Sequence, residues 1–345
     1  MYFKFIIIRR EYRVMEYRTV LIPEHCKILI QNNIIVYFEK DSKRCYSDIE
    51  YIENGCIMID SFRDLSHNID QMLIVGLKEL DYNLDYIFNY NHLYFSHTFK
   101  NQSNSHTILN NFKQGGGTIY DLEYFMESNN RLFAFGFYAG IVGCYLGLLQ
   151  FYYKKQSKNI HLIKPFNSYE MLFNDIYNEY VSIYIQPTIA IIGNGRCAKG
   201  VIHLLNQLNL PYTLYTKDMN KDNLHKYNII LNCILLTNLI EPFITNDTLP
   251  LFIDPTIIVD ISCDCSNINN PIPIYTRLSN FNEPIITINN NVDVIAIDNL
   301  PTLLPRDSSS AFSAKLINLF IDTNKNSWDK NRAIYQNALM VKNLL

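Results

Sequence analysis

The sequence lacks an excess of charge of either sign. Its 345 residues include 30 Lys and Arg against 33 Asp and Glu, so the formal net charge is −3. Proteins that bind the phosphates of DNA or RNA usually present a basic face. No basic cluster with interleaved aromatic residues stands out in this chain. The composition therefore predicts that nucleic acid is not a partner.

The sequence also lacks the cysteine and histidine patterns of disulfide and metal sites. Its eight cysteines are scattered, at positions 26, 45, 56, 144, 197, 233, 263 and 265. This spacing fits neither the disulfide framework of a secreted domain nor paired zinc knuckles. Cys263 and Cys265 are too close together for a structural zinc loop, and the histidines include no HExxH pattern. We predict no metal site.

A secretory signal is missing as well, because the apolar run near the N-terminus is short and is followed by charged residues. One stretch resembles a membrane span: residues 132–153 carry no charge and are about long enough to cross a bilayer. Gly-x-x-x-Gly spacings at 136–140 and 143–147 are typical of paired membrane helices. The stretch is solitary, however, and Gln150 lies near its end. We predict a buried helix that links two domains, in a cytoplasmic protein.

The sequence does contain a strand, a glycine turn and a helix in succession at residues 188–200, TIAIIGNGRCAKG. Gly193 permits a tight turn, Gly195 lets the backbone approach a pyrophosphate, and Ala198 lets the helix pack on the strand. The phosphates would lie against the positive end of the helix. This succession predicts a dinucleotide site. The alternative is a glycine turn that binds nothing.

A carboxylate after the next predicted strand indicates which dinucleotide binds. Asp218 follows the strand at 212–215, where an acidic residue would meet the ribose hydroxyls of the adenosine and repel a 2′-phosphate. Asp218 therefore favours NAD over NADP, whereas the neighbouring Lys217 opposes that preference.

Short apolar strands alternate with helical patterns through both halves of the chain. Strands are predicted at 5–8, 34–39, 72–75, 94–96, 228–233, 257–261, 284–288 and 292–297. Such alternation is typical of parallel sheets. We therefore predict an α/β protein of two Rossmann-like domains with mostly parallel sheets and an interdomain cleft. The substrate and catalytic domain would comprise residues 1–134 plus 310–345, and the NAD domain would comprise residues 135–309.

Polar side chains follow three predicted strands of the first domain. They are Glu16 and Arg18 after the first strand, Lys78 and Glu79 after residues 72–77, and His97, Lys100 and Gln102 after residues 93–96. Ligands of open α/β sheets bind at the carboxyl ends of the strands. Each residue alone is compatible with an ordinary solvated loop. Together they predict a site for a substrate rich in carboxylates and amines.

Longer motifs of the chain match one family of enzymes. The motifs are Arg10-Glu11, Glu16-Tyr-Arg18, Gly76-Leu-Lys78-Glu79, His97 with residues 100–102, residues 117–123, Phe135-Gly-Phe-Tyr-Ala-Gly140, Gly195-Arg-Cys197, Asn232-Cys233, residues 259–262, residues 271–275 and residues 297–306. With these motifs the chain resembles the NAD-dependent, lysine-forming saccharopine dehydrogenases nearly from end to end. The Phe135 motif and residues 297–306 are specific to that family.

The resemblance implies an activity and its partners. Saccharopine, a secondary amine that joins lysine to a glutarate skeleton, would be cleaved oxidatively into lysine and 2-oxoglutarate while NAD is reduced. These three small molecules would be the substrate and products, and the chain would act as a monomer. In this family a lysine and a histidine transfer the protons, and here they correspond to Lys78 and His97.

The resemblance also carries over a set of binding residues. The substrate contacts are Arg18, Lys78, Gln102, Arg131 and Phe135. The cofactor contacts are Gly195, Arg196, Asp218, Ile261, Ile297, Asp298, Asn299 and Leu300. Cys197 and Cys233 match a cysteine pair that can form a disulfide in this family. In a reducing cytosol we expect them to be thiols, with redox sensing as a hypothesis.

The chain departs from the family pattern at five positions, which we expect to cluster on the NAD side. They are Asn130, where the family has arginine, Ala198 for glycine, Asp222 for threonine, Leu235 for tyrosine and Gly116 for histidine. Two other functions stay open. One is an amino acid oxidoreductase that resembles alanine dehydrogenase, a group that shares the N-terminal arginine and the lysine and histidine of the first domain. The other, which these departures favour, is a catalytically silent relative that binds NAD.

Overall fold

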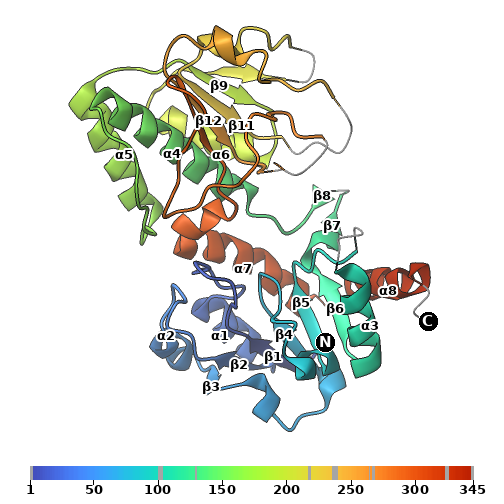
Figure 1. Cartoon of the computed structure of the whole chain (residues 1–345). Helices are drawn as coiled ribbons and strands as arrows, with labels where there is room; N and C mark the ends of the chain where they lie inside the picture. Colours follow the sequence, from blue (N-terminus) through green and yellow to red (C-terminus); the bar gives the residue numbers. More distant parts are fainter. Residues whose placement is uncertain are drawn as a thin grey trace. The chain divides into compact units, whose positions relative to one another are not determined.

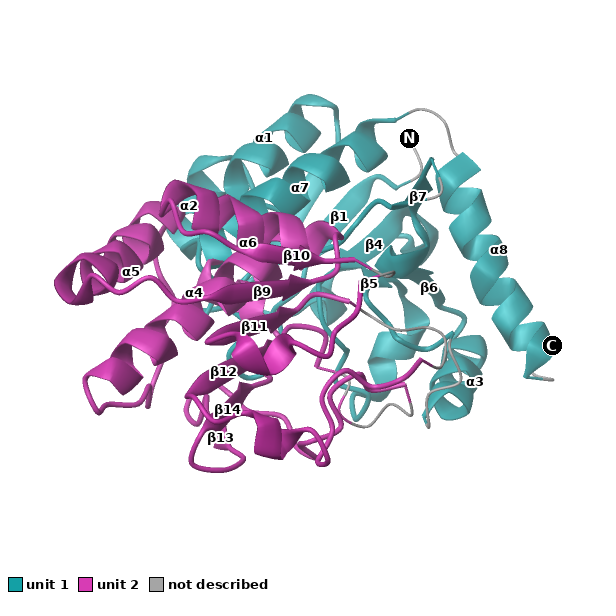
Figure 2. Ribbon diagram, turned by 90° about the horizontal axis from the view of Figure 1, so that it is seen from above, with its two compact units in different colours: residues 1–134, 305–345 teal, residues 135–304 magenta. Residues whose placement is uncertain are grey.

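The computed structural model describes residues 3–99, 104–128, 130–216, 219–234, 240–263, 265, 269–322 and 326–342. The chain divides into two compact units, one of residues 1–134 with 305–345 and the other of residues 135–304 (Figure 2). The chain returns to the first unit at Pro305, whereas the sequence placed the boundary at 310. Pro305 is the first residue of helix α7 (Pro305–Ile321), and proline suits the first turn of a helix. Because a helix packs as one piece, the boundary falls at its start.

The first unit is built on a parallel sheet with the strand order β3-β2-β1-β4-β5-β6. Its strands are β1 (Phe5–Ile8), β2 (Ile35–Glu39), β3 (Ile57–Ile59), β4 (Met72–Val75), β5 (Asn91–Tyr94) and β6 (Thr118–Asp121). Every residue of β1 and β4 is buried, as expected for parallel strands that are covered on both faces. The strand order reverses direction between β1 and β4, which is where ligands bind in sheets of this kind.

Helices cover both faces of this sheet. They are α1 (Pro23–Gln31), α2 (Asp48–Glu53), α3 (Ser105–Gly115), α7 and α8 (Asn326–Val341). Leu109 and Phe112 of α3 share one apolar core with Tyr335 and Leu339 of α8 and with the side chains of β1 and β4 that point to that face. Helices α1 and α7 pack together on the opposite side of the sheet (Figure 1). A short hairpin of β7 (Met126–Glu127) and β8 (Asn130–Arg131) follows β6.

The second unit has the strand order β10-β9-β11-β12-β14-β13. Its strands are β9 (Ile189–Ile192), β10 (Thr213–Tyr215), β11 (Ile229–Asn232), β12 (Thr256–Asp260), β13 (Ile286–Thr287) and β14 (Val292–Ile295). Only β13 pairs antiparallel, at one edge. The predicted α/β class with mostly parallel sheets is therefore confirmed.

Helices α4 (Gly136–Lys155), α5 (Tyr169–Ile183) and α6 (Arg196–Gln207) lie on one side of this second sheet (Figure 1). The other face is covered by irregular segments and short 3-10 turns, which contribute Leu224, Ile244, Phe252 and Ile272 to the core. Among the described residues, the α-helices of the second unit thus lie on one face.

The long uncharged run forms α4, and its glycines serve packing inside the unit. A Cβ added at Gly140 would lie 1.9 Å from the carbonyl oxygen of Cys197 on α6, and one added at Gly200 would lie 1.9 Å from the carbonyl oxygen of Phe137. The backbone of each helix is therefore in close contact with a glycine of the other helix. Among the described residues, no helix is long and apolar enough to cross a membrane.

The contact between α4 and α6 yields a stability prediction. We expect Gly140→Ala to destabilise the protein by about 1–3 kcal/mol, because the added methyl group can be accommodated only if the helices separate. Gly195→Ala is the control, since a Cβ there meets no atom of the described part of the chain within 4 Å, and it should cost under about 1 kcal/mol. Denaturant unfolding of the three proteins measures the difference. Equal losses for both variants would show that the two helices are not held in tight contact.

Candidate functional site

In the first unit, the predicted catalytic residues follow neighbouring strands at one edge of the sheet. Lys78 comes after β4 and His97 after β5, and these strands are paired in parallel. The pairing continues past the strand ends, because the backbone N–H of Phe95 donates to the carbonyl of Leu77 at 3.1 Å. Lys78 and His97 therefore leave the sheet on adjacent segments.

A buried ion pair fixes the turn that carries Lys78. The carboxylate of Glu11 accepts hydrogen bonds from the backbone N–H groups of Leu77 (2.6 Å) and Lys78 (3.0 Å). Arg9 donates to Glu11 at 3.1 Å and also to the carbonyl of Lys78. A Cβ at Gly76 would lie 2.4 Å from the Arg9 guanidinium carbon, so any side chain there would displace the guanidinium. Sequence reasoning missed the roles of Arg9 and Glu11, although charges directly after an apolar strand were a signal.

Arg18 is held by Glu16 in a second buried pair. The Nε of Arg18 donates to Oε1 of Glu16 at 2.8 Å and its Nη2 donates to Oε2 at 2.6 Å. Burial alone would raise the pKa of Glu16, but the charge and hydrogen bonds of Arg18, together with the charge of Lys78, hold that pKa below its usual value. Lys78 thus lies within electrostatic reach of the pair. The remaining terminal nitrogen of Arg18, Nη1, takes no part in these two bonds.

His97 occupies a strained turn. Its φ is +51°, a left-handed conformation that costs a non-glycine residue on the order of 1 kcal/mol and often marks a functional site. Ser96 and Thr98 are buried on either side of the exposed His97. The hydroxyl of Ser96 accepts from the backbone N–H of Thr98 at 3.2 Å and donates to Asp121 at 2.6 Å.

Asp121 is the anchor of this turn. Asn331 of α8 clamps its backbone, accepting from the Asp121 N–H at 2.9 Å and donating to its carbonyl at 2.8 Å. Burial raises the pKa of Asp121, the hydrogen bond from Ser96 opposes that rise, and the charge of His97 acts in the same direction as Ser96. The Asp121 carboxylate is therefore an electrostatic neighbour of His97.

Arg131 is positioned by a carboxylate beyond β6. Its Nη1 lies 3.0 Å from Oε1 of the buried Glu123, and its side chain is 39% exposed. Arg131 lies on β8, so the hairpin brings it beside the segment that follows β6. The structure thus gathers Arg18, Lys78, His97 and Arg131 on segments that follow strands of one unit. Phe135, also predicted to contact the substrate, belongs to the second unit. Gln102 lies outside the described residues, as does Lys100.

In the second unit, the glycine turn has the geometry that the sequence predicts. Gly193 has φ +101°, and a Cβ there would lie 2.3 Å from Ile234, so a side chain is excluded. Gly195 caps helix α6, and no atom of the described residues lies within 4 Å of a Cβ added there. The exposed Arg196 begins the helix and Ala198 is fully buried. These residues fit a pyrophosphate, because N–H groups at a helix start attract phosphate. Asp218 lies outside the described residues.

The other predicted cofactor residues lie at the same edge of the second sheet. Ile261 directly follows β12, and residues 297–300 follow β14, so both come after parallel neighbours of the sheet. Ile297 and Leu300 are buried, Asp298 is exposed, and Asn299 has φ +85°.

A buried network that the sequence did not reveal supports the turn at Ile261. The carboxylate of Asp260 accepts from the Tyr275 hydroxyl at 2.5 Å and from the Asn232 amide at 2.9 Å. It also accepts from the backbone N–H of Ser262 at 3.2 Å. Asp260 therefore ties the ends of β11 and β12 together.

Phe135 and the two cysteines lie in the second unit beside the start of α6. Phe135 caps α4, and a Cβ at the next residue, Gly136, would lie 3.2 Å from the Cys197 sulfur. Both Cys197 and Cys233 are free thiols. Burial raises the pKa of Cys197 to about 11, and burial with a contribution from Cys197 raises the pKa of Cys233.

The departures from the family pattern are distributed over both units. Gly116 and Asn130 belong to the first unit, at the end of α3 and on β8. Ala198 and Asp222 belong to the second unit, and Leu235 lies outside the described residues. Among the residues that the structure describes, no group of three or more His, Cys, Asp or Glu side chains is placed to hold a metal ion.

Known protein families match both parts of the chain. Residues 7–142 match the N-terminal domain of the alanine dehydrogenase/PNT family, and residues 189–344 match its C-terminal domain.

Curated relatives cover nearly the whole chain. The saccharopine dehydrogenase [NAD(+), L-lysine-forming] of Candida glabrata is 33% identical over 335 residues, which are 90% of this chain and 89% of the relative. The proteins of that name from Yarrowia lipolytica and Schizosaccharomyces pombe are 31% and 32% identical, again over 90% of this chain and over 89% and 90% of the relatives.

Solved structures with the same fold are more distant in sequence. An L-alanine dehydrogenase aligns with a TM-score of 0.72 at 12% identity, covering 98% of this chain and 99% of that one. A transhydrogenase from Sinorhizobium meliloti aligns with a TM-score of 0.66 at 11% identity, covering 92% and 93%. The sequence and fold comparisons agree, and the chain belongs to the alanine dehydrogenase/PNT family of oxidoreductases.

Proposed function

We propose that the protein is an NAD-dependent oxidoreductase that cleaves saccharopine into lysine and 2-oxoglutarate. The observation that carries this proposal is the placement of Lys78 and His97 after paired strands, each on a turn fixed by a buried carboxylate. The identity of 33% to a saccharopine dehydrogenase over 90% of the chain supports the choice of substrate. The likeness to solved alanine dehydrogenase concerns the fold alone.

Gly193, Gly195 and the start of α6 would hold the cofactor phosphates, and Ile261 with residues 297–300 would line the same site. NAD would supply the oxidant, a hydride acceptor for the α-carbon of the glutarate part. Oxidation of the substrate amine would give an imine, water would add to that imine, and the resulting carbinolamine would break its C–N bond to release lysine and 2-oxoglutarate. The protein must move protons at each of these steps.

Lys78 and His97 would carry those protons, because both lie on fixed turns. The Arg9–Glu11 ion pair holds the turn of Lys78, and the hydrogen bond from Ser96 to Asp121 holds the turn of His97. Arg18 and Arg131 would bind substrate carboxylates, since a guanidinium can hold a carboxylate through two parallel hydrogen bonds. Glu16 and Glu123 already orient these two arginines. A substrate carboxylate would therefore meet guanidinium groups that need little reorganisation.

A second candidate is an amino acid oxidoreductase of the alanine dehydrogenase type. The match of residues 7–142 and 189–344 to the alanine dehydrogenase/PNT domains favours it. A catalytically silent relative is the third reading, and it would bind NAD without turnover. Direct assays separate all three.

We expect saccharopine to produce NADH with the purified protein and NAD, and alanine to produce none. Lys78→Met and His97→Gln should each lower kcat by about 100-fold or more, the usual contribution of a general acid or base. Lys113→Met and His106→Gln on the exposed face of α3 are the matched controls, and they should retain activity. The absorbance of NADH measures the turnover of the wild type and of the four variants. Turnover of alanine alone would select the second candidate, and NAD binding without any turnover would select the third.

The anchor of His97 gives a further prediction. Ser96→Ala removes the hydroxyl that joins Asp121 to the His97 turn, so we expect kcat to fall by about tenfold. The pH dependence of kcat should change, while KM for NAD should not. Ser96→Thr keeps a hydroxyl and should restore part of the rate. Ser61→Ala, which removes a similar turn hydrogen bond to Arg63, is the control. An unchanged pH profile in Ser96→Ala would count against a positioning role.

The cysteines allow a test of the redox hypothesis. The thiolate is the reactive form of cysteine, and burial raises the pKa of Cys197 to about 11. Because the raised pKa keeps the thiol protonated at neutral pH, alkylation of Cys197 should be slow there and should keep rising up to about pH 10, whereas an unstructured cysteine levels off above about pH 9. Mass spectrometry after timed iodoacetamide treatment, with a free cysteine peptide as control, measures this. A plateau for Cys197 near neutral pH would indicate an activated, redox-sensitive thiol instead.

A further inference from the structure

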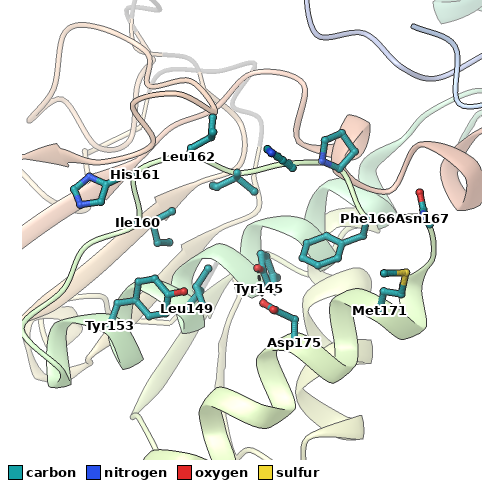
Figure 3. Close-up of a pocket in the computed structure, with 13 residues that line it drawn as sticks. Tyr145, Leu149, Tyr153, Ile160, His161, Leu162, Phe166, Asn167, Met171 and Asp175 are labelled. Atoms are coloured by element: carbon teal, nitrogen blue, oxygen red, sulfur yellow. Dashed lines mark hydrogen bonds between the residues drawn. The ribbon is translucent and has the colours of Figure 1, made fainter. Parts of the chain in front are cut away.

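We propose that a groove on the helical face of the second unit binds a small amino acid with a cationic side chain. The groove lies between α4, α5 and the extended residues 160–167, and it has a volume of about 450 Å³ (Figure 3). None of the residues predicted for the substrate or the cofactor lines it. The choice of ligand rests on the proposed function in one respect. The lysine that the proposed reaction releases is an amino acid with a cationic side chain.

One side of the groove offers a carboxylate on an aromatic surface. The hydroxyl of the buried Tyr145 donates to Oδ2 of Asp175 at 2.8 Å, and Figure 3 shows the two side chains meeting. Among the described residues, no donor contacts the other oxygen, Oδ1. The ring of Phe166 stands edge-on to Tyr145, with centroids 5.4 Å apart. Asp175 is therefore oriented by Tyr145 and leaves one oxygen for a ligand.

A second carboxylate lies close to the acidic side of the groove. Glu179 lies one helical turn after Asp175 on α5 and lines an adjoining cavity of about 500 Å³, which shares Tyr153 and His161 with the groove. Tyr153 lies within reach of both acids: burial raises its pKa, and the charges of Glu179 and Asp175 raise it further. An ammonium group would meet two negative charges and the rings of Tyr145 and Tyr153, which attract cations.

The opposite side of the groove is basic. His161 and Lys164 are exposed on the extended segment, where they suit the carboxylate of an amino acid. The apolar side chains of Leu149 and Met171 line the space between the two sides. A molecule with an amine at one end, a carboxylate at the other and a methylene chain between them therefore matches the groove.

The segment that forms the basic side is fixed, so the groove exists before a ligand binds. The backbone N–H of Ile160 donates to the side chain of the fully buried Gln150 at 3.1 Å. Further along, Ile163 donates to the carbonyl of Phe281 at 3.0 Å and Phe166 donates to that of Leu303 at 2.8 Å. Gln150 is itself bonded to the buried Asp293 of β14 at 2.9 Å. A preformed site loses little entropy on binding.

Calorimetric titration of the full chain with L-lysine, in the absence of NAD, tests the proposal. We expect saturable binding that Asp175→Asn weakens by about tenfold or more, because the variant replaces a charged acceptor by a neutral amide. Glu179→Gln should weaken it less. Glu170→Gln changes the same charge on the same helix outside the groove, and it should bind lysine as the wild type does. L-norleucine, which lacks the side-chain amine, should bind at least about tenfold more weakly.

Lys78→Met separates the groove from the proposed catalytic site. Lysine binding that survives in Lys78→Met and is weakened in Asp175→Asn supports the groove. Binding lost in Lys78→Met but unchanged in Asp175→Asn and Glu179→Gln would overturn it, as would the absence of binding to the wild type at millimolar lysine. The titration needs no turnover, so it stands even if the saccharopine assay fails.

Discussion

Burial of charge at the ends of parallel strands is the constraint on which the first unit depends. Arg9, Glu11, Glu16 and Arg18 are at most 5% exposed, and isolated ions in such places would cost several kcal/mol each. They are tolerated because each carboxylate is matched to a guanidinium and to backbone N–H groups. The same bonds tie the segment after β1 to the turn after β4. The stability of the fold and the position of Lys78 therefore depend on one set of contacts.

In the second unit, glycines fix the turns and the helix packing, because they allow close contacts that a side chain would block. Gly193 admits the turn after β9 because no Cβ fits beside Ile234, and Gly140 and Gly200 let α4 and α6 approach until their backbones touch. At the ends of β11 and β12, the carboxylate of the buried Asp260 holds Asn232 and Tyr275. The first unit thus fixes its strand ends mainly with ion pairs, and the second mainly with close backbone packing and the hydrogen bonds of Asp260.

Strands β1 and β4 and the glycine turn could be predicted because each is a local pattern, an apolar run or a pair of glycines. Strand β5 was placed three residues too late, since it begins with Asn91 and the fully buried His92. His92 is accommodated through a hydrogen bond to the carbonyl of Ile87 at 2.8 Å, which no periodicity reveals. The anchor of His97 was out of reach for another reason. Asn331 lies 210 residues beyond Asp121, and only the packing of α8 on the sheet brings them together.

Three of the five departures from the family pattern have local explanations in the structure. Gly116 has φ +81° and ends α3, a conformation that glycine adopts without strain and histidine does not. Asp222 bonds to Asn220 in an exposed turn, at 2.8 Å. Ala198 is fully buried on the helix face that packs inward. Each of these residues suits its local backbone conformation or its place in the core. None of them takes part in the contacts that hold Lys78 or His97. The differences at Gly116, Ala198 and Asp222 therefore leave the anchored turns of Lys78 and His97 in place.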